Sequence, residues 1–308
     1  FGLHMAQTAG LALASDLVPR NKRPRVVALL YFMMLAGMIG ASGGYSLLLA
    51  DFNPMRLIQV IQGTAVFVIA VNVVAIWKQE ARDPRRTALD RVTQGFIEAL
   101  RDYRSDPGVM RLLLAVGVGS SAFSMQDILL EPYGGEILGL GVSQTTLLTG
   151  LWAAGTMLGF AWAGHALQHG AEMHRVAGRG LLIGIAAFSA VILASPLQMI
   201  GLFYAGAAAI GLGGGLFAVS TMLAAMSVSG TAQNGIVVGA WGAVQATAIG
   251  VGLMVAGLLK DGINGLARNG MLGEAMNTDA AGYMVVYQIE IVLLFVCLAI
   301  IGPLSGRR

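Results

Sequence analysis

Long apolar runs separated by short polar connectors dominate the chain. Eight runs reach the roughly 20 residues that a helix needs to cross a membrane. They cover residues 26–48, 56–77, 109–130, 143–166, 178–195, 199–226, 233–259 and 283–303. Residues 1–15 resemble the second half of a ninth span, so we expect earlier helices to be missing from this chain. The pattern predicts an all-α polytopic membrane protein.

The composition narrows the class of protein. Of 308 residues, 56% are hydrophobic and 11% are charged, whereas soluble domains carry about 25% charged residues. A soluble globular enzyme is therefore excluded. The 43 glycines follow no collagen-like repeat and are typical of closely packed membrane helices. The single cysteine, Cys297, lies in an apolar run and excludes a disulfide framework.

Basic residues predict the topology. When the connectors are assigned alternately to two sides, 16 of the 19 Lys and Arg residues fall on one side. By the positive-inside rule that side is cytoplasmic. Trp77 and Trp162 then lie near cytoplasmic helix ends, and Tyr133, Tyr283 and Tyr287 lie near the opposite membrane face, as expected for interfacial aromatic residues.

The connector 78–108 divides the chain into three parts. Residues 1–77 are the remainder of an N-terminal helix bundle, 78–108 form a cytoplasmic linker, and 109–308 form a C-terminal six-helix bundle. Apolar residues at helical spacing predict an amphipathic helix over 87–104. This helix is either a linker lying in the membrane interface or a docking surface for a partner. Asp106 and Pro107 supply the start signal of the next span.

Two groups of helices around a long basic loop resemble the major facilitator superfamily, which has twelve helices in two halves. By count, the chain covers helices 4–6 and 7–12. Residues 16–25 resemble the loop between helices 4 and 5. Between helices 8 and 9, Gly170, His174, Arg175, Gly178 and Arg179 are similar to the G-x-x-x-D-R-x-G-R element of the superfamily. Here His replaces Asp, and one extra residue intervenes.

Three segments resemble one branch of that superfamily. They are Q-D-I-L-L-E-P-Y-G-G at 126–135, Gln7-Thr8 followed by 11–16, and Asn234-Gly235 followed by 239–246. These segments are similar to the PucC-type family of light-harvesting assembly proteins, also called the bacteriochlorophyll delivery family. The resemblance implies a non-enzymatic factor in the bacterial inner membrane or the intracytoplasmic photosynthetic membrane.

The same resemblance implies partners and ligands. The partners would be light-harvesting antenna polypeptides or a reaction-centre antenna complex, within membrane lipids and without nucleic acid. Bacteriochlorophyll and carotenoid are the candidate ligands. A secondary transporter that moves a small solute by alternating access is the alternative function. The helices carry no Lys or Arg well inside the membrane, which favours an apolar ligand or partner over a polar solute.

His4 is the first candidate ligand of a pigment. Helical rise places it about 18 Å deeper than Asp16, near mid-bilayer. Its imidazole either binds the magnesium of bacteriochlorophyll or forms a hydrogen bond to a neighbouring helix. Gln7 and Gln126 are further candidate pigment-binding residues.

Acidic residues give the remaining candidates. Asp127 and Glu131 are four residues apart, so we expect them to share a helix face near the outer surface. They either cap a helix end before Pro132, contact pigment or a partner, or couple to protons. Glu290 is expected to be neutral and hydrogen-bonded, to reach outward, or to face a partner.

Other motifs carry little chemistry. His165 and His169 have the spacing of a metal pair, with His174 nearby, but the cluster lacks an organised carboxylate and favours interfacial histidines over metal. Gly211 and Gly213–Gly215 follow no strand and predict close helix packing. The sequence contains no Walker A motif, nucleophile elbow or metalloprotease helix.

Overall fold

The computed structural model describes residues 23–77, 107–227 and 234–304, and every regular element in these ranges is helical. The α-helices are α2 (Arg23–Leu48), α3 (Pro54–Ile76), α5 (Pro107–Ser124), α6 (Leu130–Glu136), α7 (Val142–Gln168), α8 (Met173–Ala194), α9 (Ile200–Ser227), α10 (Asn234–Arg268) and α11 (Ala281–Ile301). Short 3₁₀ turns are η2 (Met125–Ile128), η3 (Glu274–Met276) and η4 (Gly302–Leu304). The eight predicted full spans are confirmed, with α5, η2 and α6 forming one of them.

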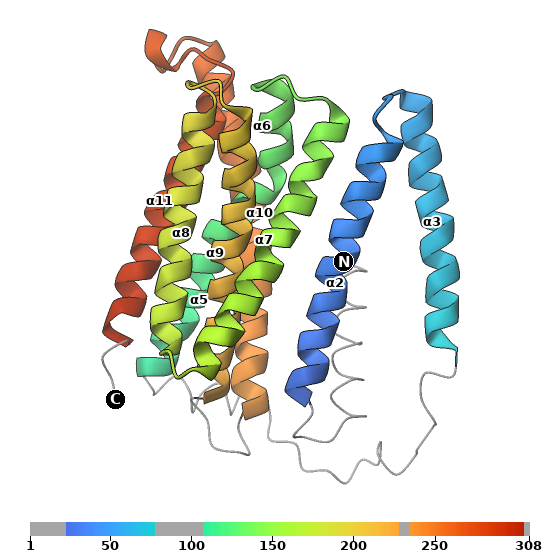
Figure 1. The fold of residues 1–308 in the computed structure, drawn as a ribbon. Helices are drawn as coiled ribbons and strands as arrows, with labels where there is room; N and C mark the ends of the chain where they lie inside the picture. Colours follow the sequence, from blue (N-terminus) through green and yellow to red (C-terminus); the bar gives the residue numbers. More distant parts are fainter. Residues whose placement is uncertain (1–22, 78–106, 228–233, 305–308) are drawn as a thin grey trace, which may run out of the picture.

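The helices run alternately up and down, so their connectors gather at two ends of the bundle (Figure 1). One end contains Arg23, Arg111 and Arg175, and we call it the basic end. The other contains Asp51, Glu131, Glu136 and Asp279, and we call it the acidic end. This arrangement agrees with the predicted alternation of the connectors. The predicted ninth span and the 87–104 helix lie outside the described residues.

Helices α7, α8 and α9 pack through glycines. A methyl group at Gly155 would collide with the carbonyl of Ala208, and one at Gly211 would collide with the carbonyl of Trp152. At Gly213 it would lie 2.6 Å from the carbonyl oxygen of Gly180. Only glycine allows backbones to approach this closely. The packing role predicted for residues 211–215 is confirmed.

A row of hydroxyl groups joins α2 to α7 near the acidic end. Ser46 Oγ donates to the Ser143 carbonyl over 2.9 Å, and Ser143 Oγ donates to the Ser46 carbonyl over 2.7 Å. Ser42 Oγ donates to the Thr146 carbonyl over 2.5 Å and accepts from the Gly150 amide over 3.0 Å. We call these residues the hydroxyl seam. It ties the first group of helices to the second.

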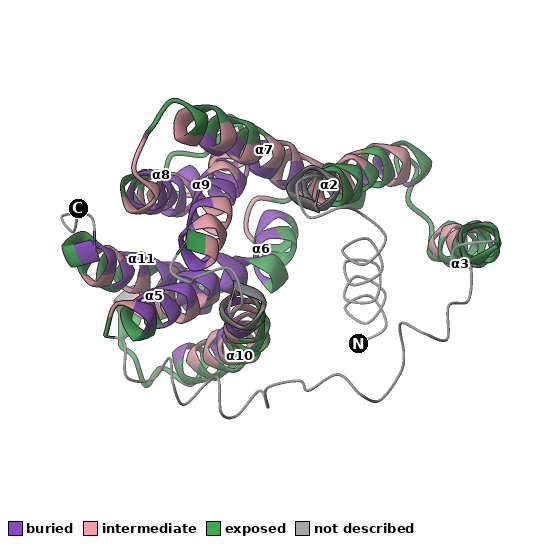
Figure 2. Ribbon diagram, turned by 90° about the horizontal axis from the view of Figure 1, so that it is seen from below, coloured by how far each residue is buried: buried purple, intermediate pink, exposed green. Residues whose placement is uncertain are grey.

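Helix α3 lies apart from the other described helices (Figures 1 and 2). None of its residues is buried. Its one hydrogen bond to α2 within the described chain joins Tyr45 Oη to Thr64 Oγ1 over 3.0 Å. Most of its 23 residues are apolar, and they therefore face lipid or segments that the structure does not describe.

Two helices are longer than predicted. Helix α10 continues to Arg268, nine residues past the predicted end, and α8 begins at Met173 rather than 178. Apolar patterning marks only the part of a helix that crosses hydrocarbon, because backbone hydrogen bonding continues through charged residues such as Lys260 and Asp261 once the helix enters the headgroup region.

Candidate functional site

The helix that begins at Pro107 breaks near the acidic end, and the break positions the candidate residues. Helix α5 ends at Ser124, η2 follows, and α6 begins at Leu130. Pro132 explains the break, because proline has no amide hydrogen to donate to the carbonyl of Ile128 and its ring clashes with that carbonyl. Pro132 itself is tolerated because it lies in the first turn of α6. Broken membrane helices are common at the binding sites of transporters.

Gln126 and Asp127 lie in the 3₁₀ turn at this break. Gln126 is 2% exposed, and its amide donates a short hydrogen bond to Oδ1 of Asp127. Asp127 itself is exposed. At the break, the exposed carboxylate of Asp127 is thus held by a hydrogen bond from the buried side-chain amide of Gln126.

Asp127 and Glu131 lie in different elements and make different contacts, and their predicted common face stays a prediction. The prediction assumed a continuous helix, but Asp127 lies in η2 and Glu131 lies in α6. Glu131 Oε1 instead accepts a hydrogen bond of 2.6 Å from Thr149 Oγ1 of α7. Glu131 therefore fastens α6 to α7, and the two acids act separately.

Three tyrosines form an aromatic cluster in the core beside the break. The ring of Tyr133 lies 5.4 Å from that of Tyr283, 5.6 Å from that of Tyr287 and 5.7 Å from that of Phe203. All three tyrosines are fully buried. They lie toward the acidic end as predicted, but they do not form an interfacial belt, because they pack on one another instead of facing lipid.

Glu290 is the most unusual acid in the described chain. It lies in α11, one turn after Tyr287, and it is 0% exposed. Neither of its carboxyl oxygens has a hydrogen-bond partner among the described residues. Helix α11 packs against η2, the turn that carries Gln126 and Asp127. Because the side chain is buried, the predictions that Glu290 reaches outward or faces a partner are wrong. The predicted hydrogen bond to Glu290 is not formed with any described residue.

Burying an unpaired carboxyl group costs several kcal/mol. A contribution to the stability of the fold therefore does not explain why a glutamate occupies position 290. Together with Asp127, Gln126 and Tyr287, it forms what we call the inner polar cluster. The sequence pointed to Gln126, Asp127 and Glu290 individually, but it did not predict that the helix carrying Glu290 packs against the break. The helical spacing of Tyr283, Tyr287 and Glu290 on α11 was the available signal.

The predicted pigment ligands His4 and Gln7 lie outside the described residues. His165 and His169 lie at the end of α7, and His174 lies at the start of α8. The rings of His165 and His169 are 4.2 Å apart, and Nδ1 of His169 lies 2.8 Å from the carbonyl oxygen of His165. His174 lies 3.4 Å from Glu172. Among the described residues, no three His, Cys, Asp or Glu side chains gather as a metal site would require.

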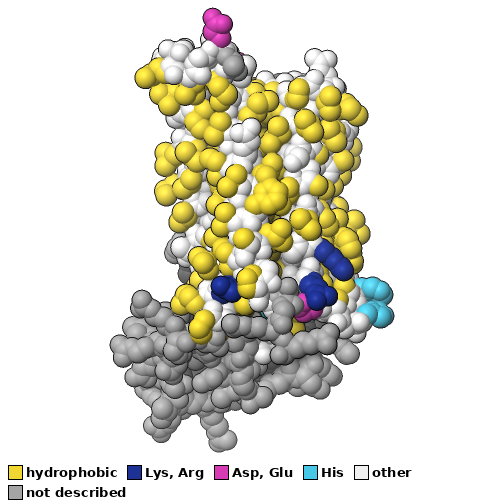
Figure 3. All heavy atoms as spheres, turned by 90° about the vertical axis from the view of Figure 1, so that its left-hand side faces the viewer, with side chains coloured by type: hydrophobic (Ala, Val, Ile, Leu, Met, Phe, Trp, Pro, Cys, Tyr) yellow, Lys and Arg dark blue, Asp and Glu magenta, His cyan; other side chains and the backbone are white. Residues whose placement is uncertain are grey.

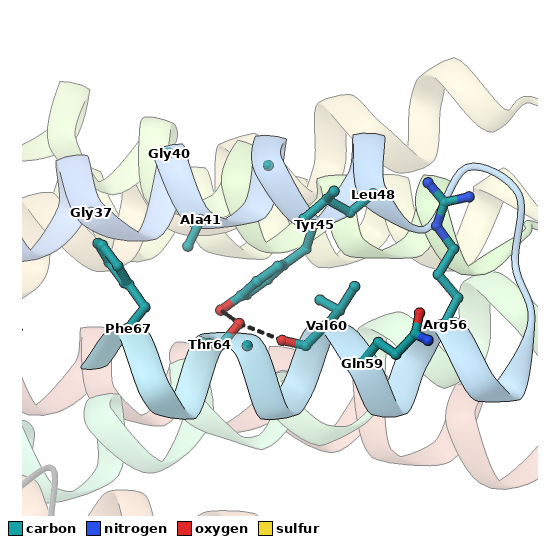
Figure 4. A pocket seen from close by; sticks show the side chains of 12 residues that line it. Gly37, Gly40, Ala41, Tyr45, Leu48, Arg56, Gln59, Val60, Thr64 and Phe67 are labelled. Carbon is teal, nitrogen blue, oxygen red and sulfur yellow. Dashed lines mark hydrogen bonds between the residues drawn. The ribbon is translucent and has the colours of Figure 1, made fainter. Parts of the chain in front are cut away.

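A second feature is a groove of about 740 Å³ between α2 and α3 (Figure 4). Its α2 wall carries Gly37, Gly40 and Gly44, and a methyl group added to any of them would meet nothing within 4 Å. Arg56 and Gln59 of α3 lie toward one end, near the connector between the helices. The groove is mostly apolar and open, and sequence analysis did not identify it.

Comparison with known proteins places this geometry in a family. The whole chain, residues 1–308, matches the family described as PUCC protein. It is 48% identical to "Uncharacterized protein in puhA-bchM intergenic region" of Rhodobacter capsulatus over 98% of this chain and 64% of that protein. It is 43% identical to "Protein PucC" of the same organism over 99% of this chain and 66% of that protein. The chain thus spans about two thirds of the length of these relatives.

The fold has a solved counterpart. A bacterial homolog to the human lysosomal transporter Spinster, in an inward-facing and unoccupied conformation, superimposes with a TM-score of 0.67. The match covers 96% of this chain and 73% of that chain at 15% sequence identity. At this identity the likeness concerns the fold alone. The sequence and structure agree that this multi-pass membrane protein has a fold of the major facilitator type and belongs to the PUCC protein family.

Proposed function

We propose that the protein is a non-enzymatic assembly factor for bacterial light-harvesting antenna complexes. Membership of the PUCC protein family over the whole chain carries this proposal. The partners are antenna polypeptides or a growing reaction-centre antenna complex, in the bacterial inner membrane or the intracytoplasmic photosynthetic membrane. Antenna polypeptides are membrane helices, and an apolar helix with no buried residue among the described ones, such as α3, offers the kind of surface that they contact.

The inner polar cluster supports direct handling of bacteriochlorophyll. Magnesium prefers oxygen ligands, and Asp127 offers an exposed carboxylate held by Gln126. Asp127 would hold the pigment through its magnesium, which would supply the Lewis acid. His4 and Gln7 stay candidate ligands, and carotenoid is a second candidate pigment.

Secondary transport of a small solute is the alternative function. The fold resembles that of a transporter, and the broken helix with a buried acid beside it is typical of transporter binding sites. Against this alternative, the described helices have no basic residue deep in the membrane to pair with Glu290. A site for a polar solute usually gathers more convergent polar groups.

The test is affinity purification of the tagged full-length protein from photosynthetic membranes in several mild detergents, followed by mass spectrometry and absorption spectroscopy. We expect antenna polypeptides to co-purify, and pigment absorption to fall in Asp127→Asn without loss of protein. Glu131→Gln is the matched control, because Glu131 is bonded to Thr149 of α7 and not to Gln126. Recovery without antenna polypeptides, together with saturable solute uptake by liposomes, would establish the transporter function instead.

A further inference from the structure

A small groove lies at the basic end, between the start of α8 and the end of α11. It has a volume of about 300 Å³. Its rim is formed by His174, Arg175 and Arg179, and its apolar floor by Leu182, Leu298 and Ile301. We call it the α8–α11 groove. It is remote from the inner polar cluster, which lies toward the acidic end.

The polar and apolar parts of the groove follow one another along the membrane normal. Arg175, Arg179 and Leu182 lie on one stripe of α8 because they are spaced four and three residues apart. Helical rise places Leu182 about 10 Å deeper than Arg175. Helix α8 has 22 residues and is long and apolar enough to cross the membrane, which puts its first turn among lipid headgroups. Charge at headgroup level above an apolar floor is the order of groups in a phospholipid.

The rim keeps a positive charge after the local ion pairs are counted. Glu172 pairs with Arg175, whose Nε lies 3.0 Å from Oε2. Arg179 forms no ion pair with a described residue, and both guanidinium groups are exposed. In Figure 3, the basic side chains of this face lie toward its lower end, among hydrophobic side chains and beside an acidic one. A guanidinium group binds phosphate oxygens with two parallel hydrogen bonds, which makes arginine a strong phosphate ligand.

We propose that the α8–α11 groove is a binding site for an acidic phospholipid of the cytoplasmic leaflet, whose phosphate contacts Arg179 and Arg175 and whose acyl chain lies on Leu182 and Leu298. Basic pockets between membrane helices on the cytoplasmic side bind acidic headgroups in the same way. Glu172 limits the affinity because it competes for Arg175. This site does not depend on the proposed function of the protein.

The test is native mass spectrometry of the delipidated full-length protein titrated with phosphatidylglycerol, with phosphatidylcholine as the neutral lipid. The wild-type protein should retain phosphatidylglycerol in preference to phosphatidylcholine. Arg175→Gln combined with Arg179→Gln should lower the apparent affinity roughly thirtyfold. Arg111→Gln is the matched control, because Arg111 is an exposed arginine at the same end of the bundle but outside the groove. It should bind as the wild type does.

A second variant gives an effect of opposite sign and keeps both arginines. Glu172→Gln should increase retention of phosphatidylglycerol, because it removes the carboxylate that competes for Arg175. Inorganic phosphate should not displace the lipid, since it makes no contact with the apolar floor. Displacement by phosphate would instead show a site for soluble anions.

Three results would overturn the proposal. The first is an equal loss of phosphatidylglycerol affinity in the double variant and in Arg111→Gln. The second is equal retention of phosphatidylglycerol and phosphatidylcholine by the wild type. The third is unchanged retention of phosphatidylglycerol in Glu172→Gln. If the variants changed the mass of a protein dimer or of an antenna complex instead, the groove would be a protein interface.

Discussion

The hydroxyl of Tyr283 in α11 donates a hydrogen bond of 2.7 Å to Oε2 of Glu136, the last residue of α6. This bond joins the short helix after the break to the last span. A bond between Asn264 Oδ1 and the amide of Gly282, 2.8 Å long, joins α10 to the same end of α11. Together they hold α6, α10 and α11 around the aromatic cluster at the acidic end.

Removal of this hydroxyl should loosen the acidic end. Tyr283→Phe deletes the bond and keeps the ring in the aromatic cluster, so we expect a loss of about 1–2 kcal/mol in the free energy of unfolding. Denaturant unfolding of the detergent-solubilised protein measures it. Tyr204→Phe is the control, because the Tyr204 hydroxyl lies 3.4 Å from its acceptor at an exposed site. Equal losses in both variants would contradict the structural role of the Tyr283 bond.

Replacement of Glu290 should raise stability. Glu290→Gln keeps the shape of the side chain and removes a buried carboxyl group without a described partner, and Glu290→Leu removes its polarity altogether. We expect the melting temperature in detergent to rise, most in Glu290→Leu, while antenna assembly in a complemented deletion strain falls. Glu274→Gln changes an exposed acid at the same end and should alter neither property. A lower melting temperature in Glu290→Leu would show that the carboxyl group is bonded in the membrane.

The glycine contacts predict a large difference between two identical substitutions in α9. In Gly211→Ala the new methyl group collides with the carbonyl of Trp152, so α7 and α9 must separate, at a cost of about 1–3 kcal/mol. In Gly201→Ala the methyl group meets nothing within 4 Å and the cost should be near zero. Yield and melting temperature of the purified variants measure the difference. A tolerant Gly211→Ala would mean that α7 and α9 pack less closely in the membrane.

Cysteine labelling tests the topology. Asp51 lies in the connector at the acidic end, and His169 lies in a connector at the basic end. A membrane-impermeant maleimide should label Asp51→Cys in intact spheroplasts and His169→Cys only after the cells are permeabilised. The native Cys297 is buried and should give no background signal. Labelling of both positions from one side would contradict the alternation of the helices.

The sequence predicted the eight full spans because membrane insertion demands long apolar runs, and these are visible without any tertiary information. The apolar pattern does not predict the break near Pro132. The apolar pattern predicts one helix that ends before Pro132, whereas the structure has a break at 125–129 and a further helix, α6, that contains Pro132. A missing hydrogen bond to Ile128 was deducible from the sequence.

Other features depend on contacts between distant parts of the chain. The burial of Tyr133, Tyr283 and Tyr287 arises because α5, α6 and α11 meet, and periodicity within one helix cannot show which helices are neighbours. For the same reason the sequence does not predict the groove between α8 and α11, although Arg175 and Arg179 belong to the motif between helices 8 and 9. His4 and Gln7 lie outside the described residues and stay predictions.

The contrast between the two kinds of helix contact has a mechanical consequence. Backbones that touch through glycine leave no side chain that could change rotamer, so α7, α8 and α9 can shift only as one block. Helices α2 and α7 are joined instead by side-chain hydroxyls, which can rotate and can act as donor or acceptor. Any relative motion of the two groups of helices should therefore turn about this line of serines, with the glycine-packed block acting as the rigid arm.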